Sequence, residues 1–349
     1  MALTVSSAFN SFLNNTVNIQ KGDSDKAKRS RDFLIEQISN LSSEGQFLKL
    51  APQYNCFFGS FSRKTKICVI DDIDFLLGLN GGNLQVQGSE WDNITLKVKD
   101  NSDSTLVGLS DKFVERWTNT TIYQLNSTKV KNSLINALNQ IDQYEKAEIH
   151  SRGEAVTLKL KSHPWNFDIV PAFYCSGDAF SKPYYLIPNG KGKWKKTNPK
   201  VEQERISKLN QDYNGMVLET VRLVKYWNRY KQMPNISSYV LETMVLDYFD
   251  KGWFNNQFYR NADNVYMHFS KVLEYISNNV YNPINDPKGI QGNINNLFYD
   301  QKTKIAEKAR GDYANSVNAI ACEMRHNDHH DAITKWREIF GMEFPNYGY

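Results

Sequence analysis

Two carboxylates one residue apart, placed directly before an apolar run, constrain this chain more than any other feature of its sequence. Asp72 and Asp74 are followed at once by Phe75-Leu76-Leu77. The alternation predicts a strand, and in a strand residues i and i+2 project from the same face, about 6.5 Å apart. Two like charges beside apolar residues are costly unless cations hold them. The fold must therefore bring positive charge to this strand.

Divalent cations suit this pair, because Mg²⁺ prefers oxygen ligands and shares them with substrate phosphates. Two such ions about 3.5–4 Å apart can activate an attacking hydroxyl and stabilise a leaving pyrophosphate. Asp168 lies in a second alternating run, WNFDIVPAF, and we expect it to complete the site. It is also the candidate general base. A DxD pair alone more often marks a turn or a solvated strand end, so the prediction depends on the whole set.

A Gly-Ser pair precedes the carboxylates by a short basic segment, in the order GSFSRKTKICVIDDID. Glycine lets a phosphate approach the backbone, and a helix N-terminus offers free N–H groups and a positive dipole end. The Ser60 hydroxyl adds a donor. Gly59 and Ser60 therefore predict a phosphate site beside the metal site. Asp71, which strand alternation turns away from Asp72, is expected to face solvent or to support the site.

The apolar pattern predicts an α+β chain of two lobes. Strands are expected over 53–58, 72–77, 154–160 and 165–173, and helices over 24–42 and 129–142, whereas residues 80–127 are hard to assign. After residue 205 the spacing is helical, with helices expected around 217–224 and over 237–249, 263–279, 300–324 and 328–340. We expect a mixed-sheet lobe at 1–204, ending after a basic loop at 189–199, and a helical lobe at 205–349.

Composition excludes several classes of protein. The chain has no run of about 18 apolar residues, so the sequence does not predict a membrane span. The first residues, MALTVSSAFNSFLNNT, lack the basic and apolar regions of a secretion signal. The four cysteines show no CxxC spacing, which argues against a zinc ribbon and a disulfide scaffold. We therefore expect a cytoplasmic protein with no membrane partner, and we expect Trp227, Trp336 and Phe340 in its core.

Taken together, these segments resemble the polymerase-beta-type nucleotidyltransferases and, more narrowly, the bacterial CD-NTases, relatives of cyclic GMP–AMP synthase and oligoadenylate synthase. GSFSRKTKI followed by DDIDFLL resembles the first motif of the family, and NFDIVPAF resembles the segment with the third carboxylate. RLVKYWN and SSYVLETMVL are similar to the helical segments that hold the nucleotide. YYLIPNGKGKWKKTNP, NDPKGIQGN and KWREIFGMEFP resemble three further family segments. The resemblance spans most of residues 25–345.

The resemblance implies an enzyme that makes a cyclic di- or trinucleotide from nucleoside triphosphates, ATP, GTP or both, with two Mg²⁺ ions or with Mn²⁺. It also implies antiphage (CBASS) signalling, with a downstream effector that reads the product. Two alternatives stay open: an enzyme that makes linear oligonucleotides or RNA tails, and a non-catalytic nucleic-acid-binding module. The segment HNDHHD, residues 326–331, has no cysteine set beside it. It predicts a polar helix face and argues against zinc-dependent DNA sensing.

The resemblance also implies roles for individual residues. The metal would be held by Asp72, Asp74 and Asp168. The nucleotide would be bound by Gly59, Ser60, Lys225, Ser238, Tyr239, Thr197 and Asn198. Lys225 would contact phosphates, and Tyr239 would stack on a base, a contact worth about 1–3 kcal/mol where it occurs. Plainer interpretations stay open: Lys225 as a solvated helix lysine, Ser237 or Ser238 as a helix cap, and KGKWKK as an exposed basic turn.

Overall fold

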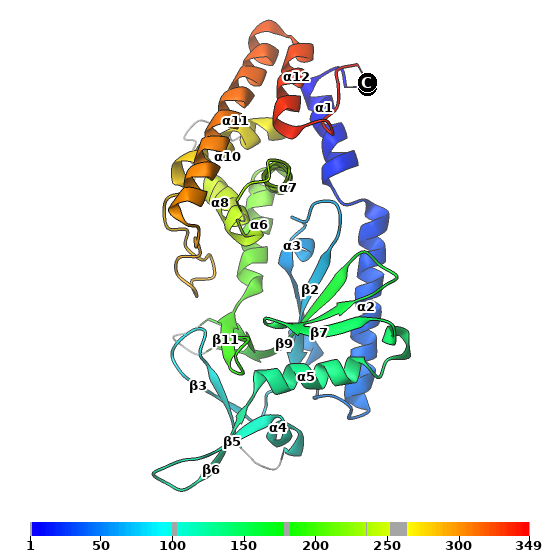
Figure 1. Ribbon diagram of the computed structural model, residues 1–349, viewed down its shortest axis with the longest axis vertical. Helices are drawn as coiled ribbons and strands as arrows, with labels where there is room; N and C mark the ends of the chain where they lie inside the picture. Colours follow the sequence, from blue (N-terminus) through cyan, green and yellow to red (C-terminus); the bar gives the residue numbers. More distant parts are fainter. Residues whose placement is uncertain (1, 100–102, 178–181, 235, 252–263, 349) are drawn as a thin grey trace. The chain divides into compact units, whose positions relative to one another are not determined.

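The chain folds into two compact units, a sheet unit and a helical unit (Figure 1). The computed structural model describes residues 2–99, 103–177, 182–234, 236–251 and 264–348. The sheet unit comprises Gly22–Ser62 and Ile70–Val201, and the helical unit comprises Met1–Lys21, Arg63–Val69 and Glu202–Tyr349. A mixed-sheet unit and a helical unit in one chain confirm the predicted α+β class.

The bounds of these units differ in detail from the expected lobes. The division between Val201 and Glu202 falls within helix α6 (Pro199–Asp212). Two segments expected in the first lobe, Met1–Lys21 and Arg63–Val69, group with the C-terminal helices because their apolar side chains, including Ile67, join the helical core. The assignment of residues 1–204 and 205–349 as functional domains stays a prediction.

A seven-stranded mixed sheet forms the centre of the sheet unit. Its main path runs β1 (Cys56–Phe58), β2 (Asp72–Leu79), β9 (Asn166–Cys175), β10 (Tyr184–Pro188) and β11 (Trp194–Thr197), and β8 (Ala155–Lys159) and β7 (Glu148–Arg152) join through β9. β2 and β9 are parallel, and the other pairs are antiparallel. The predicted strands that carry Asp72 and Asp168 are therefore neighbours in the sheet, although they lie far apart in the sequence.

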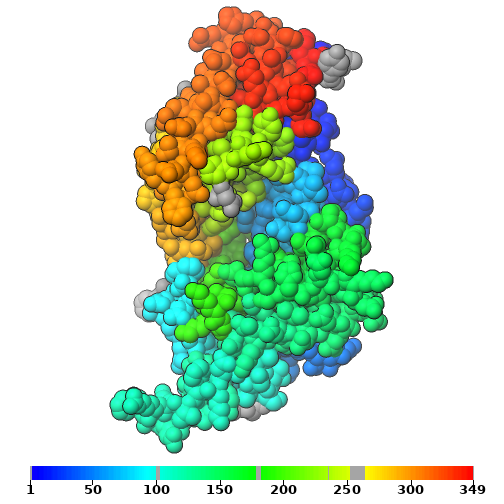
Figure 2. Space-filling view, in the orientation of Figure 1, coloured from blue at the N-terminus to red at the C-terminus, as the bar shows by residue number. Residues whose placement is uncertain are grey.

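A second sheet and the remaining helices complete the sheet unit. The second sheet lies within the stretch that was hard to assign, with antiparallel strands in the order β3 (Leu84–Gln87), β4 (Thr95–Val98), β6 (Thr121–Leu125) and β5 (Ser110–Val114). The helices are α2 (Lys21–Ser43), α3 (Gly59–Ser62), α4 (Ser104–Gly108) and α5 (Ser127–Leu138), with short 3₁₀ helices at Pro52–Tyr54 and Asp142–Tyr144. The hairpin of β5 and β6 projects from this unit (Figure 2).

The basic stretch at 189–199 is only partly a loop, and the expectation of a loop throughout is wrong. Its second half forms β11, which pairs antiparallel with β10. Trp194 explains the strand, because its side chain is fully buried and its indole Nε1 donates to the Leu125 carbonyl at 2.9 Å. Lys195 pairs with Glu154. Lys195 and Lys196 thus belong to a strand at the sheet edge, whereas Lys191 and Lys193 lie in the exposed bend before it.

In its described residues, the helical unit is built mainly from long helices. They are α1 (Val5–Phe12), a π-helical turn at Leu13–Val17, most of α6, α7 (Met216–Tyr230), α8 (Ser238–Asp250), α10 (Val265–Asn279), α11 (Tyr299–His326) and α12 (His329–Phe340). The predicted C-terminal helices are therefore confirmed to within a few residues, although residue 263 lies outside the described residues. Within the described part of the chain, no helix combines the length and apolar character needed to cross a membrane.

Aromatic side chains fill the core of the helical unit. Trp227, Trp336 and Phe340 are fully buried, as predicted. Helix α1, which the sequence pattern did not predict, begins after Thr4, whose side chain accepts from a backbone N–H of the first turn. Its Phe9 packs edge-on against Trp336 with ring centroids 4.9 Å apart. The N-terminal helix is thereby part of the same core as the C-terminal helix.

The HNDHHD segment is a polar helix face only in part, because it contains the last residue of α11, two residues between the helices and the first residues of α12. Asn327 ends α11 in the left-handed conformation, with φ of 49°. Asp328 then caps α12, because its side chain accepts from the Asp331 N–H at 2.9 Å. Short polar side chains favour both positions, since they tolerate left-handed backbone and satisfy free N–H groups.

The aromatic core predicts a large difference between two tryptophans. Trp336→Ala should lower the free energy of unfolding of the helical unit by about 3–5 kcal/mol, because it leaves a cavity among packed rings. Trp117→Ala is the matched control, since Trp117 is 91% exposed and should change stability by less than about 0.5 kcal/mol. Urea denaturation followed by circular dichroism measures both. Equal effects of the two substitutions would contradict the described packing.

Candidate active site

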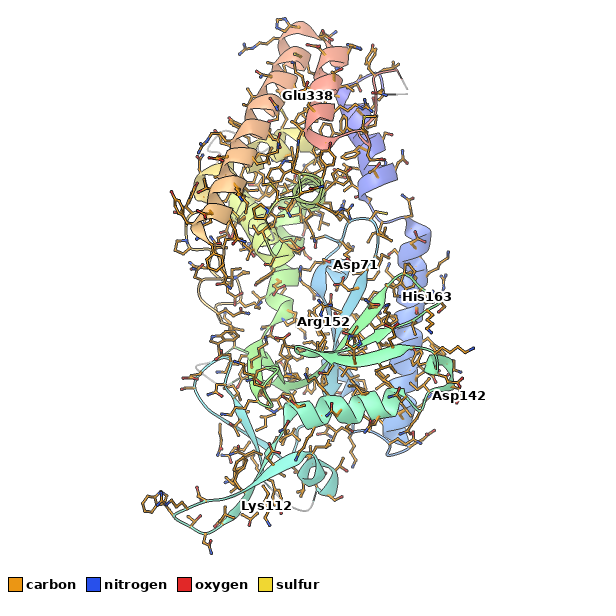
Figure 3. The ribbon with its side chains drawn as sticks, viewed as in Figure 1. Asp71, Lys112, Asp142, Arg152, His163 and Glu338 are labelled. Carbon is orange, nitrogen blue, oxygen red and sulfur yellow. The ribbon has the colours of Figure 1, made fainter. Side chains whose placement is uncertain are left out.

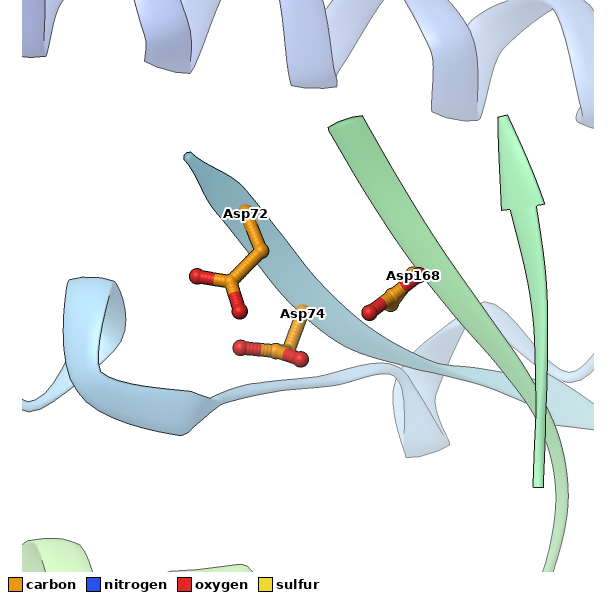
Figure 4. A group of neighbouring side chains, drawn as sticks. All are labelled: Asp72, Asp74 and Asp168. Atoms are coloured by element: carbon orange, nitrogen blue, oxygen red, sulfur yellow. The ribbon is translucent and has the colours of Figure 1, made fainter. Parts of the chain in front are cut away.

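The three carboxylates singled out from the sequence meet in the sheet unit (Figure 4). Asp72 and Asp74 lie at the start of β2, and Asp168 lies on the parallel strand β9. One oxygen from each lies within 4.8 Å of the others. The predicted convergence is therefore confirmed. In the ranges that the structure describes, no other group of three or more His, Cys, Asp or Glu side chains comes as close together.

Strand register explains why these side chains converge. In the parallel ladder, Asp74 lies directly opposite Asp168. The alternating neighbours Ile73 and Phe167 are buried on the other face, so burial fixes which face carries the acids. Asp71 is exposed and directly precedes β2 (Figure 3), and its carbonyl accepts the Asn166 N–H at 2.9 Å.

Thr157, which was not among the residues predicted from the sequence, orients one of the carboxylates. Strand β8 places Thr157 opposite Asp168 in the antiparallel ladder, and the threonine hydroxyl donates to Asp168 Oδ1 at 2.6 Å. The Thr157 side chain is buried, as are those of its sequence neighbours Val156 and Leu158. A polar residue in an otherwise apolar buried strand was the available signal, but its partner depends on the register with β9.

The donor set fits a hard divalent cation. Three carboxylates supply only oxygen ligands, which Mg²⁺ and Mn²⁺ prefer over nitrogen or sulfur. All three side chains are half-buried, so their mutual repulsion is weakly screened by water. A bound cation would relieve this repulsion. The chemistry of these residues therefore suits metal binding, although their individual roles stay a prediction.

Gly59 has no space for a side chain. It begins α3 with φ of 72°, a conformation that favours glycine, and a Cβ at this position would overlap the Asp74 carboxylate. Phe58 lies opposite Asp74 in the ladder between β1 and β2, which brings the start of α3 to the acids. The structure therefore places Gly59, the first residue of the predicted phosphate-binding pair, beside Asp74, and Ser60 follows it in α3. Phosphate binding by this pair stays a prediction.

Lys225, in the helical unit, is not the solvated lysine that one interpretation expected. Its side chain is only 8% exposed, and its Nζ donates to Glu242 Oε1 at 2.9 Å. Arg63 Nε donates to the other oxygen of Glu242 at 3.1 Å. Burial lowers the pKa of Lys225, and the neighbouring Glu242 acts in the opposite direction. Burial would raise the pKa of Glu242, but Arg63 and Lys225 together hold it below its usual value.

The ion pairs continue from Arg63 to Tyr239. Arg63 Nη1 donates to Glu202 at 2.8 Å, and Glu202 accepts from Lys288 Nζ at 2.8 Å. The Tyr239 hydroxyl donates to Asp286 Oδ1 at 2.6 Å and accepts from Lys288 at 3.0 Å. Lys225 and Tyr239, both predicted to bind nucleotide, are thus joined by one chain of buried charged groups. The residues between them could not be predicted from the sequence, because their spacing along the chain follows no pattern.

The other residues predicted to bind nucleotide lie at the ends of a helix and a strand. Ser237 caps α8, since its Oγ accepts the Val240 N–H at 3.2 Å, and Ser238 is the exposed first residue of the helix. The cap interpretation therefore holds for Ser237. In the sheet unit, Thr197 ends β11, and the Asn198 amide donates to the Pro183 carbonyl at 2.8 Å. The nucleotide-binding roles of Ser238, Thr197 and Asn198 stay predictions.

Comparison with known proteins gives a consistent result, although no protein-family model matches the chain. A probable cyclic nucleotide synthase of Bacillus cereus (strain VD146) is 39% identical over 353 residues, which cover 99% of each chain. CdnC of E. coli MS115-1 has a similar structure, with a TM-score of 0.66 at 17% identity over 98% of this chain and 99% of that chain. Vibrio cholerae DncV, a cyclic AMP-GMP synthase and prokaryotic cGAS homolog, has a TM-score of 0.66 at 9% identity over 99% and 98%.

The contact between Gly59 and Asp74 predicts a specific defect in metal binding. Gly59→Ala should weaken Mn²⁺ binding at least about tenfold, because the new methyl group displaces the Asp74 carboxylate. Gly45→Ala is the matched control, since Gly45 has a similar φ of 77° but no described atom beyond its chain neighbours lies within 4 Å of where its Cβ would be. Electron paramagnetic resonance titration of free Mn²⁺ measures both. Equal Mn²⁺ affinities in the two variants would show that Asp74 does not bind the ion.

Proposed function

Because the chain belongs to the bacterial CD-NTases, the family of cyclic nucleotide synthases, we propose that it joins nucleoside triphosphates into a cyclic di- or trinucleotide with release of pyrophosphate. The observation that carries this proposal is the meeting of Asp72, Asp74 and Asp168 across two parallel strands. Carboxylates placed in this way would hold divalent cations beside an anionic phosphoryl group, and positioning and electrostatic stabilisation dominate the acceleration of phosphoryl transfer.

The carboxylates have a shared task in this mechanism, and Asp168 has a second one. Asp72, Asp74 and Asp168 hold Mg²⁺ or Mn²⁺, which when bound supplies Lewis-acid activation and charge stabilisation at the phosphoryl group. Asp168, oriented by Thr157, accepts the proton of the attacking ribose hydroxyl. The ribose oxygen bonds to the α-phosphorus, the bond between that phosphorus and the bridging oxygen breaks, and pyrophosphate leaves. A second step of the same kind closes the ring.

Other side chains bind the substrate. Gly59 and Ser60 lie beside Asp74 and hold the triphosphate through backbone N–H groups and a hydroxyl. Lys225 contacts phosphate oxygens, since an ammonium has three donors and Glu242 accepts one of them. Tyr239 stacks on a base. We assign a supporting hydroxyl to Ser238 and base-edge contacts to Thr197 and Asn198.

ATP and GTP are the proposed substrates. CdnC was solved with ATP, and V. cholerae DncV was solved with GTP and with the linear intermediate 5′ pppA(3′,5′)pG. We further propose that the product is an antiphage (CBASS) second messenger, read by a downstream effector, and that the enzyme works in the cytoplasm, where nucleoside triphosphates are plentiful. The family relationship supports these finer assignments.

Product analysis tests the proposed function. The protein is incubated with labelled nucleoside triphosphates and Mg²⁺ or Mn²⁺, and products are separated by thin-layer chromatography after phosphatase treatment. A cyclic product keeps its label, whereas the terminal phosphates of a linear oligonucleotide are removed. Mass spectra then identify the bases. Absence of pyrophosphate release, together with retardation of RNA in a gel, would instead identify a non-catalytic nucleic-acid-binding module.

Neutralising two of the carboxylates should abolish synthesis without unfolding the chain. Asp72→Asn combined with Asp74→Asn removes two charges from half-buried positions, so metal binding is lost while repulsion falls. We expect no detectable cyclic product and an unchanged or higher melting temperature. Asp142→Asn is the control, since Asp142 is exposed just after α5 (Figure 3). Full turnover in the double variant would contradict the metal assignment.

The hydrogen bond from Thr157 should affect the chemical step. Thr157→Val keeps the shape of the side chain but removes the donor to Asp168. We expect kcat to fall about tenfold with KM nearly unchanged, because an orienting bond to the base acts in the transition state. Thr121→Val, on β6, serves as the control. Steady-state pyrophosphate release measures both variants, and a rise in KM alone would place Thr157 in substrate binding instead.

A further inference from the structure

A single loop holds the Tyr239 side chain at two points. Residues 285–293 approach the tyrosine, whose hydroxyl donates to Asp286 Oδ1 at 2.6 Å. Two residues further along the loop, Lys288 Nζ lies 4.2 Å from the centroid of the tyrosine ring and 3.0 Å from its hydroxyl. A cation over an aromatic face is attracted by the ring quadrupole. The ring is therefore fixed at its edge by an anion and across its face by a cation.

The loop itself is held by its own backbone. Asp286 has a fully buried side chain, and besides Tyr239 it accepts the N–H groups of Lys288 at 3.2 Å, Ile290 at 3.3 Å and Gln291 at 3.0 Å. The loop closes where the Asp286 N–H donates to the Gly292 carbonyl at 2.7 Å. These hydrogen bonds within the loop hold the Asp286 carboxylate in place independently of its bond to Tyr239. Asp286 is therefore a rigid anchor for the hydroxyl.

Lys288 is fixed in the same way from outside the loop. Its side chain is only 6% exposed, and Glu202 at the start of α6 accepts from its Nζ at 2.8 Å. Burial of an ammonium is costly unless carboxylates compensate it, and Glu202 and Asp286 supply that compensation. The cation thus has little freedom to leave the tyrosine ring.

The protonation states agree with this arrangement. Burial, with the nearby Glu202 and Asp286 carboxylates, raises the pKa of Tyr239, so the phenol remains a donor at physiological pH. Burial would raise the pKa of Asp286, but the Tyr239 hydroxyl and Lys288 hold it below its usual value, so the carboxylate remains an acceptor. The hydrogen bond between these two groups therefore persists at any pH at which the enzyme would work.

We propose that Asp286 and Lys288 are positioning residues that hold the Tyr239 ring as a preformed platform for a nucleotide base. This inference rests on the proposed function, which assigns base stacking to Tyr239. In this proposal, the base stacks on the face of the Tyr239 ring opposite Lys288. Because the ring is already ordered in the free protein, the free energy of nucleotide binding is not reduced by an entropy cost of ordering it.

The helical unit contains a second pair of the same chemistry, which provides a matched control. Lys271 Nζ lies 5.4 Å from the centroid of the Tyr313 ring, 3.3 Å from its hydroxyl and 3.0 Å from Glu274. No nucleotide-binding role is assigned to Tyr313. Loss of either lysine removes a cation from a tyrosine ring. Lys288→Met also removes it from two carboxylates, Glu202 and Asp286, and Lys271→Met removes it from Glu274.

The test compares Lys288→Met with Lys271→Met in the full chain. In Lys288→Met, KM for the nucleoside triphosphate should rise about 5- to 20-fold while kcat stays within about threefold, because stacking contributes to binding and not to the chemical step. Lys271→Met should leave KM within about twofold. Lys288→Arg keeps a cation over the ring and should restore most of the affinity. Melting temperatures of the three variants separate loss of stability from loss of positioning.

Direct ATP binding, measured by isothermal titration calorimetry, separates this inference from the proposed function. If the wild-type chain turns over and Lys288→Met binds ATP as tightly as Lys271→Met does, the positioning role is wrong and the proposed function stands. If the wild-type chain makes no product but Lys288→Met weakens ATP binding at least about fivefold, the proposed function fails and the positioning role stands. A wild-type chain that does not bind ATP overturns both.

Discussion

The parallel pairing of β2 with β9 is the contact on which the candidate active site depends. Its register sets Asp74 opposite Asp168, and the antiparallel strand β8 adds Thr157 opposite the same aspartate. A slip of one residue would turn Asp168 to the opposite face of the sheet. The buried neighbours Phe167 and Ile169 prevent such a slip, because they would have to leave the core. Apolar burial thus holds three repelling carboxylates together.

The two units treat charge in different ways. In the sheet unit, three carboxylates gather into a set of oxygen ligands that a divalent cation can bind. In the helical unit, buried anions and cations alternate along one chain and balance, in the order Lys225, Glu242, Arg63, Glu202, Lys288 and Asp286. A balanced buried chain orients its members without attracting an ion. The first arrangement suits the proposed chemistry on phosphate, and the second suits positioning of the groups that we propose bind the nucleotide.

Local patterns predicted most helices and strands but failed where distant residues decide the outcome. Strand β11 was expected as a loop because its lysines dominate the local pattern, whereas Trp194 buries itself against the carbonyl of Leu125. Helix α1 was not predicted because its apolar stripe is short, and its burial depends on packing against α12, where Phe9 contacts Trp336. Lys225 was open to two interpretations, and its partner Glu242 lies on another helix. In each case the deciding contact lies far away along the chain.

The sequence by itself determined the α+β class, the two regions of different pattern and the identity of the three carboxylates, because strand alternation and apolar flanks are local properties. It also indicated the Gly59-Ser60 pair as a candidate phosphate site, because glycine before the carboxylates is a local pattern. Only the tertiary structure decided that the acids converge, that Thr157 orients Asp168 and that Lys288 covers the Tyr239 ring. These are matters of register and packing between distant segments, which no local pattern encodes.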